Sequence, residues 1–279
     1  MTRHKVLESK TTLRKMNEIS LLDYVSPSQD FVLAPFFRAG SVVNGAHWGM
    51  TLKRARSMRF RWNEKNEVRD AFFSRVFPSK TVSAVELIHS KIVVESSVCG
   101  DTKNIRADGI ATKNLNIIPV VTVADCVPIF LFDEVTGAHA AIHSGWKGTG
   151  IAGVAVNFME ERFSSRAENI LVAIGAHIGS CCYSVDDERR TAFAHDFGEK
   201  SVSGKNLSLK EANIFVLKQA GILEENITVA RECTCCTRLL SSEMTFGSFR
   251  REAAFLPEHI SLDERSRAMT VQAAFVVCD

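Results

Sequence analysis

Three residues of types that commonly bind metals stand at the ends of apolar, strand-like segments. His89 ends one such segment, Cys126 stands between two, and His143 ends another. These segments comprise residues 85–88, 120–123, 127–132 and 138–142. We expect the three side chains to converge on one point, where two imidazoles and a thiol form a ligand set for a soft or borderline metal.

Such a ligand set leaves one position of a tetrahedral metal open. Two neutral imidazoles and one thiolate on Zn²⁺ leave a net positive charge and room for water, which is typical of a catalytic site. The metal would keep Cys126 deprotonated and would either lower the pKa of a bound water to about 7 or polarise a bound oxygen. The Gly-rich turn at 144–148 precedes a predicted helix, and its N–H groups and the positive helix end favour an anion. Lys147 and the neighbouring Arg250 and Arg251 are candidate anion partners.

The residues alone leave other interpretations open, because the wide spacing of the three is not a zinc-finger pattern. Cys126 in an apolar run is typical of a small buried hydrophobic residue. His143 is also consistent with a hydrogen-bonded core histidine, and His89 with a surface residue at a strand end. Arg250 and Arg251 are consistent with a solvated pair.

Two further groups of cysteines occur later in the chain. Cys233, Cys235 and Cys236 could bind a soft metal, but no second Cys/His pair stands nearby in the sequence. Adjacent cysteines such as Cys181 and Cys182 rarely bridge each other. The spacing therefore favours reduced, partly buried thiols for both groups.

Composition indicates a globular protein. Of the 279 residues, 46% are hydrophobic and 24% are charged. The net charge of +2 is too small to favour binding to nucleic acid or to an anionic membrane. No apolar run approaches the roughly 18 residues that span a bilayer, and the charged N-terminal segment lacks the apolar block of a signal peptide. Eight cysteines without an export signal predict reduced thiols and a cytoplasmic protein.

Strand and helix patterns interleave without a regular βαβ rhythm. We therefore predict an α/β (α+β) fold, a mixed β-sheet core with helices packed on it, in a single compact domain over 31–279 after a polar N-terminal arm at 1–30. The first predicted strand, 31–34, is expected to stop at Pro35. The remaining predicted strands are 84–94, 117–123, 127–132, 138–142, 170–174, 227–230 and 269–277, and the predicted helices are 64–76, 149–162 and 210–220.

Three blocks resemble the signature blocks of the laccase-domain family. They read ADCVPI at 124–129, HSGWKG at 143–148 and IGSCCYSV at 178–185. Members of that family are described as polyphenol oxidoreductases, purine nucleoside phosphorylases and peptidoglycan editing factors. Weaker matches at 87–90, 106–109, 232–234 and 246–251 keep the family's order. The resemblance implies an α/β fold and a zinc-binding set that falls on His89, Cys126 and His143.

The chain departs from the family pattern at several positions. Leu87 replaces the family's glutamine two residues before the first histidine, and Ala-Gly-Ser-Val at 39–42 replaces its Gly-Gly-Val-Ser turn. His177 stands where many members carry cysteine or serine. Lys147 replaces an arginine and cannot offer phosphate a bidentate fork. The metal ligands therefore match the family, whereas the substrate contacts have changed.

The resemblance implies phosphorolysis of purine nucleosides, with adenosine deamination as a companion activity. The partners are then a nucleoside (adenosine, inosine or methylthioadenosine) and phosphate, and the products are the base and ribose 1-phosphate. It implies a zinc cofactor, with copper as the alternative, and it marks Cys126 and Asp125 as catalytic. Further candidates for contacts with substrate or phosphate are Arg38, Asp108, Lys147 and Arg250.

Three alternatives remain at this point. Copper-dependent polyphenol oxidation ranks low, because a multicopper site needs many histidines and none of the eight here forms a His-x-His pair. A cysteine hydrolase that edits peptidoglycan precursors would use Cys126 as nucleophile and a histidine as base. A non-catalytic binding protein is disfavoured by the intact ligand set. Zinc content distinguishes the zinc enzyme from the cysteine hydrolase, because a free nucleophilic thiol should not be occupied by a metal.

Overall fold

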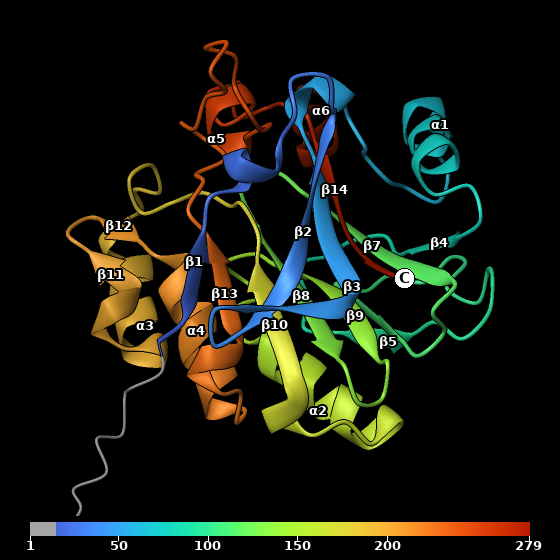
Figure 1. Cartoon of the computed structure of the whole chain (residues 1–279). Coiled ribbons are helices and arrows are strands. Elements are labelled where there is room, and N and C mark those ends of the chain that lie inside the picture. The colour runs from blue at the N-terminus through green and yellow to red at the C-terminus, as the bar shows by residue number, and fades with distance from the viewer. Residues whose placement is uncertain (1–14) are drawn as a thin grey trace, which may run out of the picture.

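Two β-sheets lie against each other between layers of helices in the computed structural model, which describes residues 15–279 except the side chain of Leu262 (Figure 1). The larger sheet has seven strands and mixes parallel with antiparallel neighbours. Its order is β1 (Asn17–Ile19), β13 (Ile227–Ala230), β10 (Ile170–Ile174), β8 (Val127–Asp133), β9 (His139–Ser144), β6 (Gly109–Thr112) and β5 (Val93–Glu95). The predicted mixed-sheet α+β fold is confirmed.

The smaller sheet has five strands. Its order is β2 (Phe31–Arg38), β3 (Ser41–Thr51), β14 (Gln272–Cys278), β7 (Ile117–Val123) and β4 (Thr81–Ala84). A separate hairpin joins β11 (Val202–Ser203) to β12 (Asn206–Leu207). The helices are α1 (Glu67–Val76), α2 (Ile151–Phe163), α3 (Asp187–Phe197), α4 (Leu209–Gln219), α5 (Phe249–Glu252) and α6 (Leu262–Arg267).

Hydrophobic clusters lie on both faces of each sheet. Between the sheets, Trp48 of β3 stacks on Phe130 of β8 with ring centroids 5.1 Å apart. Ile129 and Leu131 of β8 point the opposite way, into the cluster shared with α2, α3 and α4. The far face of the smaller sheet is covered by α1. Because β8 is buried on both faces, its sequence is a continuous apolar run rather than an alternating one.

Most predicted elements match the observed ones closely. The strands predicted at 117–123, 170–174 and 227–230 agree with β7, β10 and β13 to the residue. The helix predicted at 64–76 begins later, at Glu67, because the Asn66 side chain accepts a hydrogen bond from the N–H of Arg69 and caps the helix. No helix among residues 15–279 is long and apolar enough to cross a membrane.

Two predicted strands are wrong. The strand predicted to stop at Pro35 continues to Arg38, because β2 is an edge strand, where a proline need not donate to a neighbour, and the pairing shifts just after it. The strand predicted over 84–94 is mostly a loop that contains His89; it overlaps only the last residue of β4 and the first two residues of β5. The leading part of the predicted arm, residues 1–14, lies outside the described residues. Its remainder contributes β1 to the larger sheet and buries Leu21.

Candidate metal centre

The fold brings His89, Cys126 and His143 together. Their ligand atoms all lie within 4.8 Å of one another. The two imidazole rings meet edge to face, with centroids 4.9 Å apart and an interplanar angle of 87°. Zinc bonds of 2.0–2.3 Å in tetrahedral geometry require ligand atoms about 3.5 Å apart. Small side-chain movements would therefore let the three residues hold one metal ion.

Each of the three side chains comes from a different segment. His89 lies in the loop between β4 and β5, Cys126 in the turn between β7 and β8, and His143 within β9. In the larger sheet, β8 and β9 are antiparallel neighbours, and Val127 pairs with Ser144. This pairing places the start of β8 beside the end of β9, so that Cys126 and His143 meet at one edge of the sheet.

The loop of His89 is shaped by the carboxylate of Asp108. This carboxylate accepts hydrogen bonds from the backbone N–H groups of His89 (2.9 Å) and Ser90 (2.6 Å) and from the Ser90 hydroxyl (2.7 Å). His89 has φ +58°, in the left-handed region that non-glycine residues seldom occupy. Three converging donors thus hold a turn where the sequence pattern predicted a strand.

The same carboxylate also orients His143. Nδ1 of His143 lies 2.9 Å from Oδ1 of Asp108, and both side chains are buried. Burial alone would raise the pKa of Asp108, but the His143 hydrogen bond and charge and the Ser90 donors lower it to about 2. A carboxylate at Nδ1 leaves Nε2 of His143 for a metal, an arrangement common around metal-binding histidines. Asp108, predicted as a substrate or phosphate contact, is therefore hydrogen-bonded to two of the three candidate ligands, to the ring of His143 and to the backbone of His89.

Cys126 is favoured as a thiolate even without a metal. Burial alone would raise the pKa of its thiol, but His143 and His89 lower the pKa to about 6. Burial likewise opposes the charged form of His143, yet Cys126 and Asp108 raise its pKa to about 10. The two groups thus form a thiolate–imidazolium pair, and a divalent cation would take the place of the imidazolium proton.

Asp125, predicted as catalytic, directs its carboxylate into the neighbouring loops. Oδ1 accepts from the Thr234 hydroxyl at 2.6 Å, and Oδ2 accepts from the Ser248 hydroxyl at 3.0 Å and the Arg250 N–H at 2.7 Å. Burial raises the pKa of Asp125, and these three donors oppose the increase. Asp125 also adopts φ +82° immediately before Cys126. Its contacts anchor the turn that presents Cys126.

Gly145 leaves space directly beside the three ligands. A Cβ atom at this position would lie 3.0 Å from Cδ2 of His89, 3.1 Å from Sγ of Cys126 and 3.7 Å from Cε1 of His143. At Gly148 a Cβ atom would lie 2.8 Å from the Ser90 carbonyl. The Gly-rich turn therefore packs against the loop of His89, and glycine is needed for that close approach.

Cationic and aromatic side chains lie around the group formed by His89, Cys126 and His143. Arg189 lies over the Trp146 ring at 4.1 Å, and Nζ of the exposed Lys147 lies 5.3 Å from the same ring. Arg250 lies 5.5 Å from the Tyr183 ring. Burial raises the pKa of Tyr183, and the nearby charge of Cys126 adds to the increase. Sequence reasoning did not single out Arg189 and Tyr183; Tyr183 stands within the block at 178–185, whereas nothing in the sequence distinguishes Arg189 on α3.

Arg38, predicted as a substrate or phosphate contact, is not brought to this group. Its guanidinium contacts Glu134, the Asn226 side chain at 3.3 Å and the Asn169 carbonyl at 3.2 Å. Glu134 follows the C-terminal end of β8, whereas Cys126 precedes its N-terminal end. Arg38 thus lies at the opposite end of that strand, held by other parts of the chain.

Fold and site together define an α+β protein in which two histidines and one cysteine form a candidate metal-ligand group. A family model described as "Multi-copper polyphenol oxidoreductase laccase" matches residues 63–256. The chain belongs to this laccase-like family, and the predicted resemblance is confirmed.

Relatives and solved structures agree with this assignment. A purine nucleoside phosphorylase of Clostridium acetobutylicum is 32% identical over 182 residues, which cover 63% of this chain and 73% of that protein. Purine nucleoside phosphorylase YlmD of Geobacillus stearothermophilus is 37% identical over 155 residues, 52% of this chain and 55% of the relative. The crystal structure of YlmD matches with a TM-score of 0.70 at 25% identity, over 91% of this chain and 98% of that chain. Adenosine deaminase RL5, from an unknown prokaryotic organism, is 34% identical over 140 residues, 46% of this chain and 53% of the relative.

Proposed function

We propose that this protein is a zinc-dependent enzyme that cleaves purine nucleosides, such as adenosine and inosine, with phosphate to give the base and ribose 1-phosphate. The observation that carries the proposal is the group of His89, Cys126 and His143, whose ligand atoms lie within 4.8 Å of one another. The names of two relatives as purine nucleoside phosphorylases support the reaction class. We include adenosine deamination and cleavage of methylthioadenosine as companion activities, the first supported by the name of the relative RL5.

Zinc is proposed rather than copper because of the donor set. Two imidazoles and one thiolate suit a catalytic zinc with one open position. A mononuclear copper site can share these donors, but a multicopper oxidase needs many histidines, commonly as His-x-His pairs, and none of the eight in this chain forms such a pair. All eight cysteines are free thiols. Free thiols and a zinc thiolate fit a reducing compartment, and we propose the cytoplasm.

We assign a separate role in phosphorolysis to each of several residues of this chain. When bound, zinc supplies positive charge and Lewis acidity at the ligand group. Asp108 holds the Nδ1 proton of His143 and keeps both histidine-bearing segments in position. Lys147 and Arg250 are proposed to hold the phosphate that attacks the anomeric carbon as the base departs with the electrons of the glycosidic bond. Arg189 covers one face of the partly exposed Trp146 ring, and we propose that the purine packs against the ring surface that stays exposed.

Phosphate dependence tests the reaction type. We expect cleavage of inosine or adenosine by the purified zinc-loaded chain to require phosphate and to yield ribose 1-phosphate, because phosphate is the nucleophile. Product analysis with and without phosphate measures this directly. Free ribose released at the same rate without phosphate would show hydrolysis instead and would contradict the proposal.

Lys147 tests the proposed phosphate contact. We expect Lys147→Ala to weaken phosphate binding by about 1.5–3 kcal/mol, the range of a hydrogen bond to a charged group. Lys147→Arg should preserve or strengthen binding, because a guanidinium can form two parallel bonds to phosphate. Steady-state kinetics at varied phosphate concentration measure both variants. Lys65→Ala, at an exposed lysine before α1, is the control, and an unchanged phosphate KM in Lys147→Ala would rule the contact out.

A cysteine hydrolase is the second candidate, and one observation favours it. The Cys126 thiol, with its pKa lowered to about 6 beside His143, has the character of an activated nucleophile. Such an enzyme would be active without metal and would release an amino acid from a peptidoglycan precursor. Removal of zinc distinguishes the phosphorylase from the cysteine hydrolase. Chelation should abolish nucleoside cleavage by the phosphorylase, whereas it should free the Cys126 thiol and keep a hydrolase active.

A further inference from the structure

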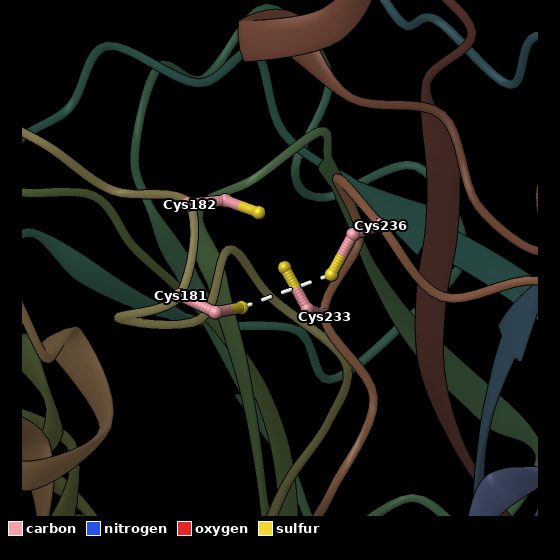
Figure 2. A group of neighbouring side chains, drawn as sticks. All are labelled: Cys181, Cys182, Cys233 and Cys236. Atoms are coloured by element: carbon pink, nitrogen blue, oxygen red, sulfur yellow. Dashed lines mark hydrogen bonds between the residues drawn. The ribbon is translucent and has the colours of Figure 1, made fainter.

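Two pairs of cysteines far apart in the sequence meet in the fold. Cys181 and Cys182 lie in the loop after β10, whereas Cys233 and Cys236 lie in the loop after β13. Their sulfur atoms all lie within 4.8 Å of one another, and those of Cys181 and Cys236 are 3.7 Å apart. In Figure 2 the four side chains extend from opposite loops toward one shared space. Neither pair has a second Cys or His pair nearby in the sequence. The parallel pairing of β10 with β13 brings the two pairs of cysteines together.

The spacing of the four sulfurs fits a single tetrahedral metal ion. Zinc–sulfur bonds of 2.3 Å in a tetrahedron place the sulfurs about 3.8 Å apart. A four-iron cluster binds each thiolate to a different iron and therefore requires wider spacing. Four thiolates also fill all four positions of zinc, which is the closed form of a structural site. Cys181 and Cys236 are exposed, so an ion can reach the group from solvent.

The surrounding backbone is arranged for thiolates. The Gly179 N–H donates to Sγ of Cys233 at 3.2 Å. A Cβ atom at Gly179 would lie 3.1 Å from Sγ of Cys181 and 3.4 Å from Cβ of Cys233, so glycine lets the loops pass closely. The Arg251 guanidinium donates to the Cys235 carbonyl at 2.7 Å and to the Thr234 carbonyl at 2.9 Å, and so holds the backbone of the loop between Cys233 and Cys236.

We propose that Cys181, Cys182, Cys233 and Cys236 form a second, structural zinc site. The ion would join the loop after β10 to the loop after β13. Both loops contact the residue that precedes Cys126: the Ile178 N–H donates to the Asp125 carbonyl at 2.9 Å, and the Thr234 hydroxyl donates to its carboxylate at 2.6 Å. The second site thus stabilises the turn that presents Cys126, without touching substrate.

Zinc content of the full chain tests this proposal. We expect chain purified under reducing conditions with zinc to contain about two zinc ions per molecule, one for each site. Cys126→Ser should lose one ion and retain the other. Cys181→Ser and Cys236→Ser, each at an exposed position, should lose one ion and retain that of the His89–Cys126–His143 group. Elemental analysis measures all of these, and circular dichroism verifies folding.

Cys235→Ser is the matched control, because Cys235 lies in the same loop but outside the group of four. It should keep both ions. Cys236→His should recover the ion that Cys236→Ser loses, because imidazole can replace a thiolate on zinc. Folded Cys126→Ser protein without zinc would overturn the proposal. So would unchanged zinc content in Cys181→Ser and Cys236→Ser, or a Cys181–Cys236 disulfide in protein handled under reducing conditions. None of these outcomes depends on nucleoside cleavage, so this proposal and the proposed function can fail separately.

Discussion

Cys126→Ser is expected to remove the metal from the His89–Cys126–His143 group and to reduce nucleoside cleavage to background. A serine hydroxyl stays protonated near neutral pH and is a far poorer zinc ligand than a thiolate. The variant should remain folded, because Cys126 lies in a turn and is only partly buried. Elemental analysis and a phosphate-dependent product assay on the purified variant measure the two effects together.

The control for this variant is Cys99→Ser. Cys99 is an exposed free cysteine outside both ligand groups, so its replacement should change neither zinc content nor activity. Full nucleoside cleavage by folded Cys126→Ser would refute the role assigned to Cys126. Loss of activity with zinc still in the His89–Cys126–His143 group would instead favour Cys126 as a nucleophile.

Asp108→Asn is expected to have the second largest effect. The carboxylate accepts from the His143 ring, from two backbone N–H groups and from the Ser90 hydroxyl, and an amide places a donor where one of its oxygens accepts. Loss of such a partner typically lowers metal affinity about 10- to 100-fold. An unsatisfied buried donor also lowers the free energy of unfolding by about 1–3 kcal/mol. Competition with a zinc chelator measures the first effect, and denaturant unfolding measures the second.

Asp101→Asn provides the matched control for Asp108. The Asp101 carboxylate organises a turn in the same way, accepting from the Ser96 hydroxyl at 2.9 Å and the Val98 N–H at 3.0 Å, but it contacts none of the three ligands. We expect it to lower stability modestly and to leave zinc affinity unchanged. Equal zinc affinity in Asp108→Asn and the unmodified chain would show that Asp108 shapes the loop without supporting the metal.

The strands that precede Cys126 and the two cysteine-bearing loops were predictable from local sequence. β7, β10 and β13 are central strands whose residues are almost entirely buried, so their sequences are unbroken apolar runs with clear ends. Imidazole and thiol side chains at the ends of such runs indicated the ligand set of His89, Cys126 and His143. The chemical type of each candidate ligand could therefore be predicted from the sequence, whereas the loop that carries His89 could not.

Other features depend on contacts between residues far apart in the chain. The loop of His89 exists because Asp108 supplies a carboxylate to its backbone, and no local pattern around His89 reports that partner. Arg38 lies at the far end of β8 because Asn226 and Asn169 hold it there.

Sequence by itself determined the apolar strands, the mixed fold class and the chemical types of the candidate ligands, because each follows from local composition and periodicity. Only the tertiary structure decided which thiols meet. Cys181 and Cys182 gain Cys233 and Cys236 as neighbours because β10 and β13 pair in parallel, which brings the loops that follow them to the same edge of the sheet. Strand pairing depends on residues far apart in the chain. From the sequence alone, the cysteines could therefore be separate buried thiols as readily as members of one four-cysteine group.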